Sequence, residues 1–112
     1  PQDHLKYMVE QYRLRRDYVM RRISEIPGLS CHAPAGTFYA FIDISQLGMP
    51  CEEFAMKLLE ERQVVVVPGT AFGEFGEGYI RLSYATSMQC LEQGLQELEE
   101  FVRSHKTEGD PA

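Results

Sequence analysis

The sequence predicts a two-layer α+β domain in which helices pack over one face of a mostly antiparallel four-stranded sheet. Helical periodicities and short β-branched or aromatic runs occur in the order α-β-β-α-β-β-α, so hairpins are mixed with helices instead of alternating strictly with them. The 112 residues, 44% hydrophobic and 25% charged, suit one globular domain. We expect that domain to span residues 1–105 and a flexible polar tail to span residues 106–112.

The first helix is expected from about residue 3 to 26, because apolar residues recur there at helical spacing and Pro27-Gly28 would end it. Its many arginines could form a nucleic-acid patch. The net charge of −6 disfavours such a patch, since an acidic chain is repelled by phosphate backbones. We therefore interpret the arginines as a solvated helix face with ion pairs one turn apart. The predicted pairs are Arg13–Asp17 and Arg21–Glu25.

Two further helices are expected. Residues 51–63 have an apolar side formed by Phe54, Leu58 and Leu59 and an acidic first turn that suits the helix dipole. The last helix follows Thr86 and Ser87 and runs to about residue 104. Thr86 and Gln89 have the spacing of a capping box.

Four extended segments complete the pattern. Residues 29–33 and 37–43 flank Pro34-Ala35-Gly36 and predict a hairpin, in which Gly36 supplies the turn. Residues 64–67 are four consecutive valines, which predict a buried strand that follows the second helix directly. Residues 79–85 predict the last strand.

Arg81 stands out in that last strand, where it is the one charged residue. Side chains alternate between faces, so Arg81 should share a face with Tyr79 and Ser83, opposite Ile80, Leu82 and Tyr84. A guanidinium in such surroundings needs a partner, and its planar fork of donors matches a carboxylate. That carboxylate could belong to a ligand or to an internal residue. The internal candidates are Asp43, Glu74 and Glu77.

Several segments resemble one known family. VPGTAFG, the glycine-punctuated loop after it and YIRLSYA resemble the C-terminal small domain of class I/II (fold-type I) pyridoxal-phosphate-dependent aminotransferases, of the aspartate aminotransferase-like group. PAGTFY resembles the family's Pro-x-Gly-x-Phe-Tyr hairpin, and YRLRRD resembles its Tyr-x-x-Arg-Arg-Asp helix signature. The resemblance covers nearly the whole chain.

The resemblance implies roles for three residues. Arg81 would bind the α-carboxylate of the amino-acid substrate, and Phe72 would border the substrate region. Gly36 would lie in a hairpin turn near the active-site cleft. For Phe72 the alternative is packing beneath its loop, and for Gly36 it is a purely conformational role in the turn.

The resemblance also implies an enzyme that moves an amino group between an amino acid and a 2-oxo acid, with pyridoxal 5′-phosphate as cofactor. Lys6, Lys57 and Lys106 lack the context of the family's pyridoxal lysine. The catalytic and cofactor-binding residues would therefore lie in a large domain outside this chain. We expect the isolated chain to be inactive and the full enzyme to be a homodimer.

Other functions stay open. A lyase or synthase of the same fold, of the C–S lyase or aminocyclopropane-carboxylate synthase type, would share Arg81. A stand-alone module could use Arg81 to bind small carboxylates. In a purely structural pairing domain, Arg81 would be locked to Asp43 or Glu77.

Some chemistries are disfavoured. Gly73, Gly76 and Gly78 join two strands and lack the spacing of a dinucleotide-binding loop. The three histidines lack metal-ligand spacing, so we expect no metal site. The three cysteines suggest free thiols and a cytoplasmic location, and no apolar run is long enough to span a membrane. The first residue is not Met, which suggests a fragment or an excised domain.

Overall fold

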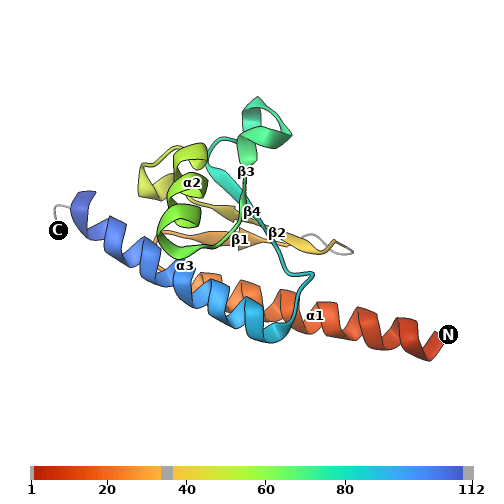
Figure 1. Ribbon diagram of the computed structural model, residues 1–112. Helices are drawn as coiled ribbons and strands as arrows, with labels where there is room; N and C mark the ends of the chain where they lie inside the picture. Colours follow the sequence, from red (N-terminus) through yellow and green to blue (C-terminus); the bar gives the residue numbers. More distant parts are fainter. Residues whose placement is uncertain (1, 34–36, 110–112) are drawn as a thin grey trace.

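The computed structural model describes residues 2–33 and 37–109, without the side chains of residues 2, 74 and 106–109 (Figure 1). Within these residues it has three α-helices and a four-stranded antiparallel sheet in the order β1-β2-β4-β3, which confirms the predicted α+β fold and element order. The helices are α1 (Gln2–Ser24), α2 (Cys51–Arg62) and α3 (Met88–Gly109). The strands are β1 (Ser30–His32), β2 (Tyr39–Asp43), β3 (Val67–Pro68) and β4 (Tyr79–Ser83). Short 3-10 turns η1 (Ser45–Leu47), η2 (Gly69–Phe72) and η3 (Glu74–Gly76) connect them.

The core lies between the sheet and the helices, which all cover the same face, as predicted. Alternation along β2 and β4 buries one set of side chains against the helices, and α1 and α3 run along that side of the sheet (Figure 1). Burial of these apolar groups is the main stabilising term of the fold. The buried strand residues are Ala40, Ile42, Ile80 and Leu82, and the helices contribute Val19, Ile23, Phe54, Leu58, Leu91, Leu95, Leu98, Phe101 and Val102.

Apolar spacing overestimated how much of the helices is buried. The first turns of α1 project beyond the sheet (Figure 1), and Leu5 and Val9 are 61% and 65% exposed. Leu59 of α2, predicted to face inward, is exposed. The cap of α3 also differs, because Ser87 accepts a hydrogen bond from the Cys90 amide at 3.1 Å where a capping box from Thr86 was expected.

Ion pairs join the helices instead of following the predicted pattern along α1. The Arg22 guanidinium binds the Glu99 carboxylate of α3 at 2.8 Å, and Arg62 of α2 binds Glu100 of α3 at 3.2 Å. The expected pairs Arg13–Asp17 and Arg21–Glu25 do not occur among the described residues. In their place the Arg13 guanidinium lies 3.9 Å from the Glu10 carboxylate, and Arg22 forms the ion pair with Glu25 that was expected of Arg21.

The strand expected over the four valines is the largest difference from the prediction. Only Val67 and Pro68 pair with β4, opposite Arg81 and Ile80. Val64 and Val65 diverge from β4, and Val65 is 71% exposed. The hairpin of β1 and β2 is confirmed by its antiparallel pairing, while its turn at residues 34–36 lies outside the described residues.

Candidate functional site

The sheet face away from the helices carries Arg81. The register of the ladder aligns His32, Phe41, Arg81 and Val67 in one row across the four strands. Arg81 is therefore in the central strand β4, and it is only partly buried. Strand alternation predicted this face correctly.

Two aromatic rings flank the guanidinium of Arg81. Its central carbon lies 4.6 Å from the ring centroid of Tyr39 and 4.3 Å from that of Phe72. Phe41 joins the cluster, since its ring centroid is 5.5 Å from Tyr39 and 6.2 Å from Phe72, both in edge-on arrangements. Cation–π contacts hold the plane of a guanidinium by its faces, so that the donors along its edge remain able to bind an acid group.

The described acidic residues proposed as internal partners are engaged elsewhere. Asp43 accepts hydrogen bonds from the backbone amide and the hydroxyl of Ser45, at 2.8 and 2.6 Å. Glu77 accepts bonds from the amides of Cys51 and Gly78, at 2.8 and 2.9 Å. These amide bonds lower the pKa of Glu77, because they stabilise its ionised form at the first turn of α2.

Arg81 consequently has no ion pair with any carboxylate whose side chain the structure describes. The side chain of the third candidate, Glu74, lies outside the described part. The arrangement is a cation on an open sheet face, oriented by aromatic rings. It can bind a small carboxylate through paired N–H donors.

A close contact between two glycines sets the loop that carries Phe72. A Cβ atom on Gly69 would lie 2.0 Å from the Gly76 carbonyl oxygen, and one on Gly76 would lie 1.9 Å from the Gly69 oxygen. No other residue type fits at either position without moving the backbone. The contact brings η2 against η3 and fixes where Phe72 leaves the loop.

The structure thus brings Arg81 and Phe72 together, whereas Gly36 lies outside the described residues. Sequence reasoning missed Tyr39 and Phe41 as members of the cluster. Alternation in the segment TFYAFID was the available signal, because it places both rings on one face of β2.

No residue of the described part fits as a cofactor-holding lysine or as a metal site. Lys6 lies on the exposed part of α1, and Lys57 pairs with Glu53 of its own helix at 3.3 Å. The described residues also contain no group of three His, Cys, Asp or Glu side chains able to hold a metal ion. Nor does any helix in them have the length and apolarity needed to cross a membrane.

Comparisons with known proteins agree on one family. The model for "Aminotransferase class I and II" matches residues 1–98. The aspartate aminotransferase of Pyrococcus horikoshii is 44% identical over 99 residues, which are 88% of this chain and 25% of that protein.

Solved structures give the same result. The aromatic aminotransferase of Pyrococcus horikoshii OT3 superposes with a TM-score of 0.89 and 38% identity over 94% of this chain and 28% of its own. A PLP-dependent aminotransferase from Streptococcus suis 89-1591 has a TM-score of 0.83 and 32% identity, over 93% and 27%. This chain therefore spans about a quarter of the length of these relatives.

Proposed function

Because the chain belongs to the class I and II aminotransferase family, we propose that it is the C-terminal small domain of a pyridoxal-phosphate-dependent aminotransferase. The whole enzyme would move an amino group between an amino acid and a 2-oxo acid, and would act as a homodimer. The contribution of this chain is the arginine that binds the α-carboxylate of the substrate.

The position of Arg81 is the observation that carries the proposal. Its guanidinium lies on the open sheet face between Tyr39 and Phe72, while Asp43 and Glu77 bind other groups. A substrate carboxylate would supply the missing anion and would be held by two parallel N–H···O bonds. Binding at that end orients the substrate, which fixes its reacting bond relative to the rest of the active site.

The chemistry of the cofactor belongs to residues outside this chain. Lys57 is paired with Glu53, and Lys6 is an exposed residue of the first turns of α1. Neither fits as the lysine that holds pyridoxal 5′-phosphate. The isolated chain should therefore show no transaminase turnover, although the intact enzyme does.

The exposed part of α1 supports the existence of a large partner domain. Leu5, Tyr7 and Val9 are each more than 60% exposed. A cluster of large apolar side chains on one helix end is typical of an interaction surface. A domain from the remaining three-quarters of the enzyme would cover it.

The test is Arg81→Ala in the intact enzyme. Loss of two charge-assisted hydrogen bonds, at about 1.5–3 kcal/mol each, should lower kcat/KM for amino acids roughly 100-fold or more. Steady-state kinetics with an amino acid and a 2-oxo acid would measure the effect.

Arg103→Ala is the matched control, because Arg103 is an exposed arginine of α3 that pairs with Glu99. It should leave kcat/KM unchanged. Unchanged kinetics for Arg81→Ala as well would refute the carboxylate role. Product analysis separates the related chemistries, since a 2-oxo acid formed without free ammonia indicates transamination, whereas pyruvate formed together with ammonia indicates a lyase.

A further inference from the structure

The turn between η3 and β4 is attached to the start of α2 by a carboxylate. One oxygen of the Glu77 side chain accepts hydrogen bonds from two backbone amides, that of Cys51 at 2.8 Å and that of Gly78 at 2.9 Å. Cys51 is the first residue of α2, and Pro50 before it offers no side-chain acceptor to this helix end. Glu77 therefore takes the place of a capping residue, although it lies 26 residues away from Cys51 along the chain.

A second group of hydrogen bonds attaches the first half of the same loop to α2. The Thr70 hydroxyl of η2 donates to the Glu52 carboxylate at 2.9 Å, and the Cys51 thiol donates to the Thr70 oxygen at 3.7 Å. Thr70 and Glu77 lie on either side of Phe72 in the sequence. The loop that carries Phe72 is thus bound to the first turn of α2 both before and after this ring.

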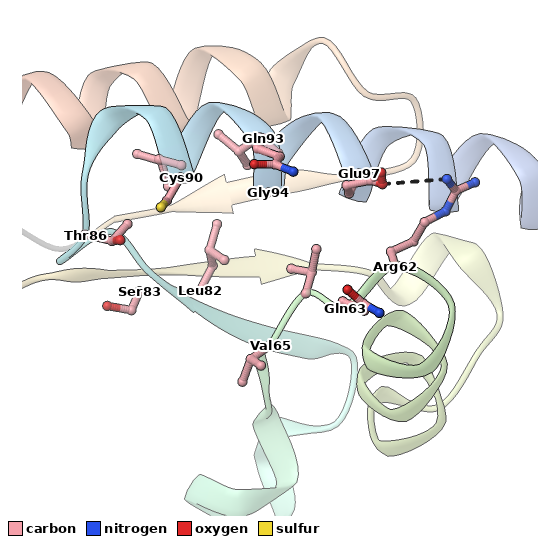
Figure 2. A pocket seen from close by; sticks show the side chains of 13 residues that line it. Arg62, Gln63, Val65, Leu82, Ser83, Thr86, Cys90, Gln93, Gly94 and Glu97 are labelled. Carbon is pink, nitrogen blue, oxygen red and sulfur yellow. Dashed lines mark ion pairs between the residues drawn. The ribbon is translucent and has the colours of Figure 1, made fainter.

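The helix α2 is itself held in place by the rest of the domain. Its side chains Phe54 and Leu58 are buried in the core. At its last residue, Arg62 forms ion pairs with Glu97 at 3.7 Å and with Glu100 at 3.2 Å, both on α3. Figure 2 shows the pair with Glu97 at the edge of a pocket of about 350 Å³ lined by residues of α2, β4 and α3. Because α2 is fixed at both ends, its first turn sets the position of the loop bound to it.

The attached segment leads directly to the candidate carboxylate site. The ring centroid of Phe72 is 4.3 Å from the central carbon of the Arg81 guanidinium. Arg81 itself follows Glu77 in β4, and the start of that strand is also fixed by a hydrogen bond from the Ile44 amide to the Gly78 carbonyl at 2.8 Å. Both the cation and one of its two flanking rings therefore depend on where this segment is held.

We propose that Glu77 is a positioning residue for substrate binding. By attaching the loop to α2 it places Phe72 against the guanidinium of Arg81, and so sets the direction in which Arg81 presents its donors to the substrate carboxylate. Glu77 acts through Phe72 and Arg81 and not by contact with the substrate. The inference rests on the function proposed above, in which Arg81 binds that carboxylate.

Loss of the attachment should weaken substrate binding more than the chemical step. The contact between Gly69 and Gly76 would still close the loop on itself, but the loop as a whole could shift against α2 and carry Phe72 away from Arg81. The guanidinium would then adopt orientations in which its paired donors do not meet the carboxylate. That bond is made in the bound substrate as well as in the transition state, so its loss raises KM more than it lowers kcat.

Glu77→Ala in the intact enzyme tests the inference. Its KM for an amino acid should rise about tenfold, while kcat falls by less than about threefold. Glu77→Gln keeps a carbonyl oxygen that can accept both amides, so its KM should stay within about threefold of the wild-type value. A residue that only stabilised the fold would lower the fraction of active enzyme, and thus kcat, without changing KM. That result would overturn the inference.

Glu53→Ala is the matched control. Glu53 is another carboxylate in the first turn of α2, and it pairs with Lys57 of the same helix at 3.3 Å. Its removal takes the same charge from that turn and leaves the bonds of Glu77 and Thr70 in place, so KM should not change. If Glu53→Ala raises KM as much as Glu77→Ala does, the charge near α2 is responsible and the positioning role is refuted.

A double substitution separates this inference from the proposed function. In an Arg81→Ala enzyme, Glu77→Ala should cause no further rise in KM, because the group through which Glu77 acts has been removed. An equal rise with and without Arg81 would refute the positioning role and leave the role of Arg81 standing. Unchanged kinetics for Arg81→Ala would refute the proposed function itself, and the positioning role with it.

Hydrogen exchange of the intact enzyme gives a readout that needs no activity. The amides of Gly73 and Gly76 donate to the Thr70 and Gly73 carbonyls, at 3.3 and 3.0 Å, so exchange of the peptide 69–78 reports how firmly the loop is held. In Glu77→Ala this peptide should exchange at least about tenfold faster, and in Glu77→Gln at the wild-type rate. Exchange at the wild-type rate in Glu77→Ala would show that Glu77 does not hold the loop, and would overturn the inference.

Discussion

At the scale of single residues, the contact between Gly69 and Gly76 explains how the loop between β3 and β4 holds an aromatic ring beside Arg81. Gly69→Ala would place a methyl group 2.0 Å from the Gly76 carbonyl oxygen, so the two turns must separate. We expect a loss of about 3 kcal/mol or more in the free energy of unfolding, as for other overpacked sites. Urea unfolding would measure it.

Gly48→Ala is the control for backbone strain alone. Gly48 has φ of +71° and open space around its missing Cβ, so alanine there should cost only about 1 kcal/mol. If the two substitutions cost the same, the close approach of Gly69 and Gly76 does not govern the loop.

Sequence reasoning predicted the sheet face on which Arg81 lies but could not decide whether an acidic residue of the chain pairs with it, for a physical reason. Alternation along a strand is a local property, so it predicted the face of Arg81 correctly. Glu77, in contrast, accepts the Cys51 amide from 26 residues away. Nothing in the local sequence indicates that a distant carboxylate will occupy the first turn of α2, so Glu77 stayed a candidate partner of Arg81 until the structure was known.

At the scale of elements, the Glu99 carboxylate joins α1 to α3. Its hydrogen bond with Arg22, and then that with Arg103, lowers its pKa in the folded protein. A lowered folded-state pKa stabilises the fold above the ordinary carboxyl pKa of about 4.3, and this stabilisation is lost as the pH falls through the folded-state pKa.

Glu99→Gln should therefore destabilise the chain at pH 7 by roughly 1 kcal/mol, and the difference from wild type should vanish in acid. Urea unfolding at several pH values between 7 and 3 would check both parts. Glu92→Gln, an exposed position on the same helix, should show no such dependence. A Glu99→Gln defect that persists unchanged at low pH would exclude the ion pair as its cause.

Element types were easier to predict than element ends. Proline, glycine and apolar spacing sufficed to give the order of helices and strands. The valine run shows the limit, because its residues have the propensity of a strand but pair with β4 only at Val67. Pairing depends on which backbone groups lie beside a strand, and the local sequence of the valine run does not indicate that.

At the scale of the whole molecule, substitutions at the exposed end of α1 should affect the stability of the intact enzyme and leave that of the isolated chain nearly unchanged. The double substitution Leu5→Ser and Val9→Ser removes side chains that are mostly exposed, so the chain alone should change by less than about 0.5 kcal/mol. In the intact enzyme the same change should lower the thermal midpoint, because burial of each side chain contributes about 1.5–3 kcal/mol. Calorimetry of both proteins would show the contrast.

Leu59→Ser is the comparison, since Leu59 is an exposed leucine on α2. It should have little effect on either protein. If the thermal midpoint of the intact enzyme is as insensitive to the α1 substitutions as that of the isolated chain, this end of α1 is exposed to solvent in the enzyme too.

The two central strands come from distant parts of the chain, with Tyr39 paired to Ser83. A nascent polypeptide therefore cannot form this sheet until the ribosome has released almost all of the domain, since the β1–β2 hairpin alone is at best marginally stable. Closing that long loop makes folding cooperative and comparatively slow. Stalled or truncated products that end before β4 would expose the apolar sides of α1 and β2 and become substrates for chaperones and proteases.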